Sequence, residues 1–400
     1  MDRRHFLGAA AAAALYPHRA FARSSARIAL LLPLTGEHAP LGQMLHGMAL
    51  AAVDAVNRGK LAGERMVTVT TEDWASDPRR FDALARRLTA GEGRAASVFG
   101  PCPHASRVEL GRYLDQVDGL LWDPAGYEGG ECSGGILHGG PTPHQSLTQL
   151  LPFMAQEVGR RFLLVSGDGA YSRALSRAAR WGLERMNAVV VAEARDDRLA
   201  WLHKIGRERI DVVFCSLEGA ALVEFLQAAH AARVDPLDTP IASPTMTELE
   251  SRFAAGHVAC QPYFADFRSL GNDRFLAGLR RRLGPAFAPN AVGEALWGQI
   301  HLFASAVAML DDIDPHPVLV REAARGREVL LPQGRVRVEA HSPHLTLWPK
   351  IAVAEANGRF KIIARSQNPV SSRPFWGGAG ACPEPVQDRD TRLDYSDNPS

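Results

Sequence analysis

Short hydrophobic runs alternate with segments of helical periodicity along the first third of the chain. The runs have the length of buried strands and lie at residues 28–32, 66–71, 96–99 and 119–122. Between them, residues 43–56 and 78–88 carry apolar side chains at the spacing of one helix face. This alternation predicts an α/β fold with a parallel, doubly wound sheet.

The same alternation starts again after residue 160. Further strand candidates are residues 162–166, 188–192, 212–215 and 241–243, and helical segments follow at 175–186, 201–205 and 220–231. A second block of this kind predicts a second α/β lobe. Gly139, Gly140 and Pro141 lie between the blocks, where the chain is expected to cross over.

The last part of the chain changes character. Two helices are expected at residues 273–283 and 291–310, followed by strands at 335–339, 350–354 and 360–364. Asn357-Gly358 between the last two strands is a strong hairpin signal. Residues 366–400 are rich in Pro, Gly and Asp, which predicts a weakly ordered tail.

The charge balance excludes one class of partner. Lys and Arg number 45 and Asp and Glu number 44, so the chain has no basic excess with which to neutralise a nucleic-acid backbone. With 400 residues and 46% hydrophobic content, it can bury one or two sizeable cores. A globular protein without a nucleic-acid partner is therefore expected.

The first 22 residues resemble a twin-arginine export signal. Arg3 and Arg4 precede a short apolar run, and Ala20 and Ala22 supply the small side chains that a signal peptidase reads. The apolar run is shorter than the roughly 20 residues that span a bilayer. We expect residues 1–22 to direct the protein to the periplasm; the alternative is a frayed Ala-rich helix with a chance Arg pair.

The cysteines do not form a disulfide scaffold. There are five, at positions 102, 132, 215, 260 and 382, without CxxC pairing. An oxidising compartment permits one bridge, and Cys102–Cys132 is the candidate pair. Cys215 and Cys260 lie in apolar runs and are expected to be small buried hydrophobic residues.

Motifs of catalysis and cofactor binding are absent from the sequence. It contains no GxSxG, P-loop or HExxH motif, and Gly91-Glu92-Gly93 precedes a strand instead of following one. The spacing of His316, His341 and His344 matches no standard metal site. We therefore expect no catalytic residues, no cofactor and no metal, although these absences weaken the case for an enzyme without excluding it.

Several strings resemble type I periplasmic binding proteins. Residues 26–57 are similar to that family's first strand, Pro-Leu-Thr-Gly turn and helix, and residues 71–80 to its second strand exit. Residues 118–145 resemble the amide- and urea-binding branch, with a Pro-x-x-Tyr-Glu-Gly segment and a Gly-Gly-x-x-Pro-x-Gln crossover. The likeness continues in order through residues 240–250, 258–267, 295–307 and 331–344, so it covers about residues 27–366.

The resemblance implies two Rossmann-like lobes joined by three crossover segments. The first lobe is expected at 27–144 plus 268–327 and the second at 145–267 plus 328–365. Family members close by a hinge on a small ligand between the lobes. This implies the substrate-binding component of an ABC importer for an amide, urea, or amino-acid- or amine-like solute, which docks on a membrane permease.

Other functions remain open on the same scaffold. A ligand-sensing regulator of the amide-sensor type would act through a protein partner, and the export signal argues against it. An enzyme, or a degenerate binding protein with an empty cleft, are further alternatives. Whether the chain forms a homodimer through its first lobe also stays open.

The resemblance places ligand contacts on both lobes. On the first lobe they are Cys102, His104, Ser106, Asp123, Ala125 and Tyr127. Ser106 could instead cap the following helix, and Tyr127 could pack beneath its loop. The amide sensors tend to carry an aromatic residue where Asp123 stands and a hydroxyl where Ala125 stands. They also have an aromatic residue near Cys102, so this pocket departs from theirs.

The second lobe is expected to contribute Tyr171, Glu218 and Thr245. Tyr171 would form an aromatic lid over a small polar solute, with packing between the lobes as the alternative. Glu218 could equally be a solvated charge at a helix start. A buried carboxylate at Asp123 would need a positive partner, and beside His104 it suggests a cationic or amine-bearing ligand.

Overall fold

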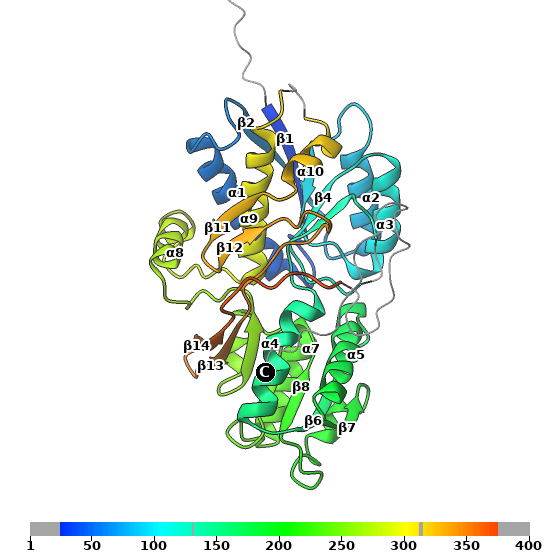
Figure 1. The fold of residues 1–400 in the computed structure, drawn as a ribbon, viewed down its shortest axis with the longest axis vertical. Helices are drawn as coiled ribbons and strands as arrows, with labels where there is room; N and C mark the ends of the chain where they lie inside the picture. The colour runs from blue at the N-terminus through cyan, green and yellow to red at the C-terminus, as the bar shows by residue number, and fades with distance from the viewer. Residues whose placement is uncertain (1–24, 130–131, 312–314, 375–400) are drawn as a thin grey trace, which may run out of the picture.

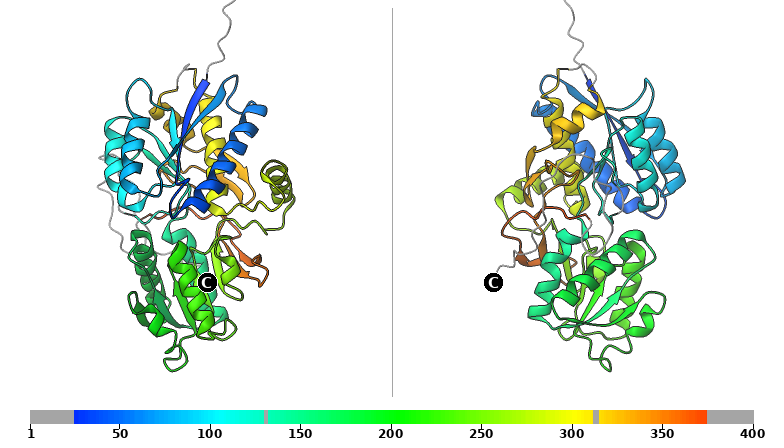
Figure 2. Two further views of the ribbon diagram at one scale, coloured as in Figure 1. Left: turned by 180° about the vertical axis from the view of Figure 1, so that it is seen from behind. Right: turned by 45° about the vertical axis from the view of Figure 1, so that its right-hand side comes forward.

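The computed structural model describes residues 25–129, 132–311 and 315–374. They form two α/β lobes stacked along the long axis of the molecule, as Figures 1 and 2 show. The predicted fold class is confirmed. The predicted export signal and residues 375–400 of the predicted tail lie outside the described residues.

The first lobe contains a five-stranded, all-parallel sheet. Its strands are β1 (Ser25–Leu32), β2 (Met66–Asp73), β3 (Ser97–Phe99), β4 (Leu121–Asp123) and β5 (Ile136–His138), in the order β2-β1-β3-β4-β5. Successive side chains of β1 enter different cores: Ile28 and Leu30 pack with α1 (Ala39–Arg58) and α9 (Ala291–Val307). Ala29 packs with α2 (Pro78–Thr89) and α3 (His104–Gln116) on the opposite face.

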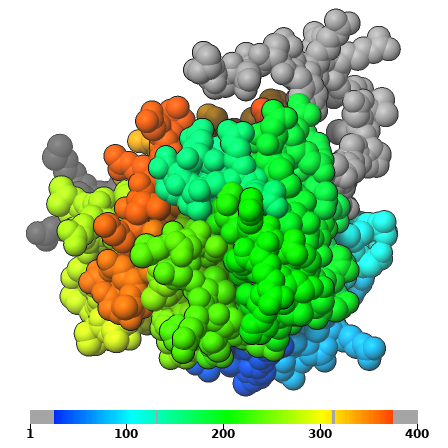
Figure 3. All heavy atoms as spheres, turned by 90° about the horizontal axis from the view of Figure 1, so that it is seen from below, coloured from blue at the N-terminus to red at the C-terminus, as the bar shows by residue number. Residues whose placement is uncertain are grey.

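The second lobe contains a seven-stranded sheet. Its strands are β6 (Arg161–Val165), β7 (Val189–Ala194), β8 (Val212–Cys215), β9 (Ile241–Ser243), β10 (Val258–Gln261), β13 (Lys350–Ala354) and β14 (Phe360–Arg365), in the order β14-β13-β10-β9-β8-β6-β7. Helices α4 (Pro143–Glu157) and α5 (Ala170–Arg185) pack on one face. Helix α7 (Gly219–Ala231) packs on the other. Figure 3 shows this lobe from below, with the C-terminal strands at its side.

The chain passes between the lobes three times. The first crossover is residues 139–142, between β5 and α4. The second is residues 262–269, between β10 and α8 (Leu270–Leu283), and the third is residues 338–349, which lead into β13. These three segments run side by side at the waist of the molecule (Figure 1).

One β-hairpin packs on the first lobe, although the prediction placed its residues in the second. Strands β11 (Glu328–Leu331) and β12 (Gly334–Arg337) form a separate two-stranded sheet. Leu331 and Val336 pack in the core of the first lobe, beside α9, whereas the prediction assigned residues 328–365 to the second lobe. The remaining helices are α6 (Arg198–Trp201), near the predicted helix 201–205, and α10 (Pro317–Ala324) on the first lobe.

The predicted C-terminal hairpin is present. β13 and β14 pair antiparallel, and Gly358 in the turn between them has a φ of 77°. The chain beyond them is held through residue 372, because Val370 and Leu347 exchange backbone hydrogen bonds of 2.7 and 3.1 Å. Ser372 N also donates to Glu339 Oε1 at 2.7 Å.

The predicted Cys102–Cys132 bridge is wrong. Cys132 is disulfide-bonded, but Cys102 keeps its thiol, as do Cys215 and Cys260. Cys102 is buried in the core between the first sheet, α2 and α3. In the part of the chain that the structure describes, no helix is long and apolar enough to cross a membrane.

Gly140, in the first crossover, packs so closely against the loop after β4 that no side chain fits at this position. A Cβ there would lie 2.0 Å from Ala125 O. We expect Gly140→Ala to lower the free energy of unfolding by about 1–3 kcal/mol, since the backbone must move. Urea denaturation followed by circular dichroism measures this. Gly93→Ala is the control, because no atom lies within 4 Å of a Cβ there. Equal urea midpoints for the two variants would contradict the claim that Gly140 is tightly packed.

Candidate ligand-binding site between the two lobes

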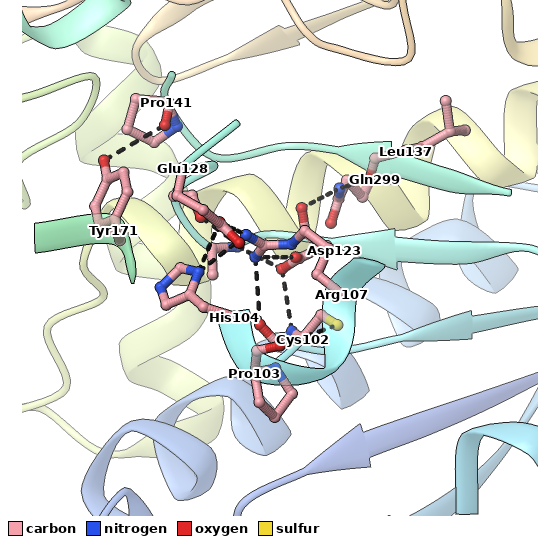
Figure 4. A network of polar contacts seen from close by, with 12 residues as sticks. Cys102, Pro103, His104, Arg107, Asp123, Glu128, Leu137, Pro141, Tyr171 and Gln299 are labelled. Atoms are coloured by element: carbon pink, nitrogen blue, oxygen red, sulfur yellow. Dashed lines mark hydrogen bonds and ion pairs between the residues drawn. The ribbon is translucent and has the colours of Figure 1, made fainter. Parts of the chain in front are cut away.

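The predicted contacts of the two lobes meet at one point. His104 begins α3, directly after the loop from β3, and Tyr171 lies in the first turn of α5, after β6. Their rings stack with centroids 5.5 Å apart and planes 22° apart (Figure 4). Both residues follow the carboxyl ends of parallel strands, where ligands of open α/β sheets bind. The arrangement identifies the space around this pair as the candidate site.

A buried arginine organises the first-lobe side of the site. Arg107 has no exposed side-chain surface, and its Nη2 donates to Asp123 Oδ2 at 2.7 Å. Its Nη1 forms an ion pair with Glu128. Nη2 also lies 3.3 Å from the carbonyl oxygens of Cys102 and Gly126. One guanidinium therefore holds the loops after β3 and β4 together.

Asp123 is fully paired within the chain. Besides Arg107, its carboxylate accepts from Ala125 N at 2.9 Å and Cys102 N at 3.3 Å. Its backbone carbonyl accepts from Gln299 Nε2 of α9 at 3.1 Å. The expectation that Asp123 awaits a cationic ligand is therefore wrong, because Arg107 supplies the positive charge.

His104 is neutral at pH 7. Burial and the charge of Arg107 lower its pKa to about 4, against smaller opposing effects of Glu218 and Asp123. Its Nδ1 lies 2.7 Å from Glu128 Oε2 and 2.9 Å from Arg107 Nη1. Spacing explains the contact with Arg107, since residues three apart share a helix face. His104 thus offers the site an uncharged ring.

Tyr171 reaches across to the first lobe. Its side chain is buried, and its hydroxyl donates to Pro141 O in the first crossover at 3.4 Å. The ring fits because Gly126 has no side chain: a Cβ there would lie 2.5 Å from Tyr171 Cζ. Burial, and next the charge of Glu218, raise the pKa of Tyr171 well above its ordinary value. Its hydroxyl is therefore a hydrogen-bond donor, not an anion.

Glu218 is the acidic group that the site leaves available. It occupies the N-cap position of α7, and its carboxyl caps no helix amide. Among the described residues it has no hydrogen-bonding or ion-pair partner. Its side chain is exposed, yet surrounding protein raises its pKa, against the opposing charges of His104 and Arg107.

Other predicted first-lobe contacts are buried in the framework. Cys102 and Ser106 are 3% and 2% exposed. Ser106 does not cap α3, whose N-cap is Pro103, and its Oγ has no partner in the described ranges. The Ala125 amide is bound to Asp123.

Two further predicted contacts serve local structure. The Tyr127 ring packs 4.5 Å from the ring of His138 and 4.7 Å from that of His344, beneath the loop after β4. Thr245 Oγ1 donates to Leu217 O at 2.5 Å and lies 2.8 Å from Ser243 Oγ. Both side chains therefore position strand exits.

Arg107, Glu128 and Gln299 were not predicted as site residues. Glu128 stands inside the Tyr-Glu-Gly string, and Arg107 follows His104 by three positions in a segment of helical character. The three-residue spacing of His104 and Arg107, which places both on one helix face, was the sequence signal that could have identified Arg107 as a site residue. Across the described residues, no group of three or more His, Cys, Asp or Glu side chains could hold a metal ion.

Fold and site together define a two-lobed solute-binding protein. Residues 26–379 match the model of the periplasmic binding protein domain. The chain therefore belongs to the periplasmic binding protein family, as the sequence resemblance predicts. This membership implies an extracytoplasmic location.

Several solved structures with this fold are substrate-binding proteins of ABC transporters. One is an amino acid ABC transporter substrate-binding protein from Pseudomonas fluorescens Pf-5, with a TM-score of 0.77 and 13% identity, covering 89% of this chain and 98% of that one. Another, from Rhodopseudomonas palustris BisB5 in complex with 3,4-dihydroxybenzoic acid, has a TM-score of 0.75 and 17% identity, covering 86% and 97%. At these identities the likeness shows the fold.

A third example binds a branched-chain amino acid. It is a branched-chain amino acid transporter substrate-binding protein from Streptococcus pneumoniae in complex with isoleucine, with a TM-score of 0.73 and 13% identity, covering 85% of this chain and 99% of that one. Among curated proteins, a limonene hydroxylase from Geobacillus stearothermophilus is 26% identical over 125 residues. The match spans 31% of this chain and 22% of that protein, so the similarity is limited to a part of each sequence.

The buried network predicts a large effect of removing its cation. Arg107→Met leaves two carboxylates, Asp123 and Glu128, buried without their positive partner. We expect it to lower the free energy of unfolding by about 3–5 kcal/mol at pH 7, measured by urea denaturation.

Arg112→Met on the same helix is the control. Arg112 is 68% exposed and pairs with the exposed Glu109, so its loss should change stability by less than about 0.5 kcal/mol. If the two variants unfold at the same urea concentration, the ion pairs of Arg107 do not hold this side of the site.

Proposed function

We propose that the protein is the periplasmic substrate-binding component of an ABC importer, and that it closes by a hinge on a small polar solute between its lobes. Family membership and the fold of the solved relatives support this role. The observation that carries it is the stacked pair of His104 and Tyr171, which brings the two lobes together at their strand ends. The chain binds and releases its solute without chemical change.

The charges at the site favour an uncharged solute. Arg107, which could pair with a ligand carboxylate, is already paired with Asp123 and Glu128. Glu218 lies near enough to His104 and Tyr171 for its charge to affect their pKa values, and it would repel a carboxylate. Relatives whose ligands carry carboxylates, such as isoleucine or 3,4-dihydroxybenzoic acid, therefore differ from this protein in ligand class.

A small amide or urea fits these groups best. The carboxylate oxygens of Glu218 accept hydrogen bonds from an amide NH₂. The neutral rings of His104 and Tyr171 cover the apolar part of such a solute. An amine-bearing solute is the next candidate, since the ionised carboxylate would pair with it.

The closed complex docks on a membrane permease, so its contact with the membrane is indirect. The paired arginines at positions 3 and 4 support export by the twin-arginine route. A regulator partnered in the cytoplasm would not need such a segment. A homodimer is compatible with this role and is not required by it.

Ligand class is tested by thermal shift and calorimetric titration. We expect acetamide, propionamide or urea to stabilise the protein, by about 2.7 kcal/mol at 100 times the dissociation constant. Acetate, benzoate and isoleucine should stabilise it less. Glu218→Ala should weaken amide binding about tenfold or more, because an amide then loses its hydrogen-bond partner.

Glu218→Gln retains a donor and an acceptor, so it should keep amide binding within a few-fold. Glu224→Gln, an exposed position on the same helix, is the matched control and should have no effect. Stronger stabilisation by acetate or benzoate than by any amide would overturn the ligand class. An unchanged dissociation constant in Glu218→Ala would remove Glu218 from the site.

A further inference from the structure

A buried lysine stands where the third crossover enters the second sheet. Lys350 is the first residue of β13 and is 2% exposed. Its Nζ donates to three backbone carbonyls: Pro262 O at 2.8 Å, Trp348 O at 2.9 Å and Gln333 O at 3.1 Å. All three donor positions of the ammonium group are therefore used.

The three carbonyls belong to three segments that lie between the lobes or beside them. Pro262 begins the second crossover, Trp348 lies in the third, and Gln333 lies in the turn between β11 and β12. That turn is part of the first lobe, since Leu331 beside it packs in the first core. One ammonium group on the second sheet thus holds two crossovers and the other lobe.

The countercharge comes from the first lobe. Glu294 of α9 is fully buried, and its carboxylate accepts from Gln333 N at 2.8 Å and Gln333 Nε2 at 2.5 Å. Gln333 Oε1 in turn accepts from Trp348 N at 3.2 Å. Gln333 therefore bridges the carboxylate and the ammonium group. The ring of Phe267, in the second crossover, lies 4.8 Å from Lys350 Nζ and adds a cation–π contact.

We propose that Lys350 is the positioning residue of the hinge, which sets the angle between the lobes by holding the second and third crossovers and the β11–β12 turn in one register. The inference rests on the proposed function, because a hinge angle matters to a solute bound between the lobes. Removing the ammonium group releases three carbonyls at once. The site residues at the strand ends stay intact, but their distance across the site is no longer fixed.

The protonation state of Lys350 provides a test of the proposal: if Lys350 sets the angle between the lobes, that angle should change with pH, whereas a purely structural role would change only the stability. Burial lowers the pKa of Lys350 to about 8, and burial raises that of Glu294 to about 7. The other titratable or charged groups facing Lys350 are Arg365 of β14 and Cys260 of β10, whose pKa of about 12 keeps it neutral up to pH 9.5. Above about pH 8, Lys350 becomes an amine with two donors for three carbonyls. The hinge tie should therefore weaken as pH rises through that value.

The distance between the lobes tests this without any ligand. Spin labels at Glu109→Cys of α3 and Arg177→Cys of α5 lie on exposed positions, one on each lobe. The three free thiols in the described part of the chain are buried and do not compete for the label. Pulsed electron paramagnetic resonance should give a narrow distance distribution at pH 7.5. It should broaden or lengthen by pH 9.5, with a midpoint near pH 8.

Lys350→Met should show the broad distribution at both pH values. Lys361→Met, an exposed lysine on β14, should behave like the parent protein. A narrow distribution that persists to pH 9.5 in the parent protein would overturn the proposal, even if Lys350→Met failed to fold. So would a folded Lys350→Met protein with the parent's distances and only a lower melting temperature.

Acetamide and urea, added in parallel titrations, separate this proposal from the proposed function. Their failure to bind would count against the amide class alone, because the distance measurement contains no ligand. If they do bind, Lys350→Met should weaken binding several-fold, and the parent's affinity should fall between pH 7.5 and pH 9.5. Unchanged affinity in a variant with altered distances would overturn the link between hinge angle and binding.

Discussion

The burial of one guanidinium determines how the first lobe presents its half of the site. A charge with no exposure is costly unless it is paired, and Arg107 is paired with both Asp123 and Glu128. This requirement draws the loop after β4 against the start of α3. Glu128 then engages the Nδ1 of His104, whose ring remains neutral and stacks on Tyr171 from the other lobe. The contact between the lobes thus depends on a network that lies entirely within the first.

The waist of the molecule is held by a second set of polar contacts. On either side of the first crossover, His138 N of β5 donates to Pro343 O at 2.7 Å and Gln145 Nε2 of α4 donates to Leu345 O at 2.8 Å, and both acceptors lie in the third crossover. Lys350 joins the second and third. Rotation of the lobes must leave these bonds in place or break them together, because each crossover is tied to another. Such coupling gives a hinge a small number of preferred angles instead of a continuous range.

Sequence alone predicted the strands that are buried on both faces. A continuous apolar run such as residues 28–32 has the length of a strand, and it is stable only where both of its faces are covered. Strands β5 and β10 are three and four residues long and carry His138 and Gln261, so no hydrophobic run revealed them. The β11–β12 hairpin follows first-lobe helices and packs with them. The resemblance alone gave no reason to place it there.

The candidate site was predictable as far as strand exits, because parallel strands bring their carboxyl ends to one edge. The pairing inside the site was not, because it depends on which side chain of α3 turns inward. Asp123 was expected to need a positive partner, and that physical argument was sound. The partner is Arg107 of the same chain. Its spacing from His104 places it on the same helix face, but spacing alone does not determine which side chain of α3 turns inward.

The central claim is that a small solute contacts both lobes at once. Hydrogen-exchange mass spectrometry with and without acetamide, urea or isoleucine tests it most directly. The account predicts that acetamide or urea, more than isoleucine, protects residues 100–107 and 123–128 of the first lobe together with 167–172 and 216–219 of the second. Protection confined to one lobe, or absent with every solute, would contradict it.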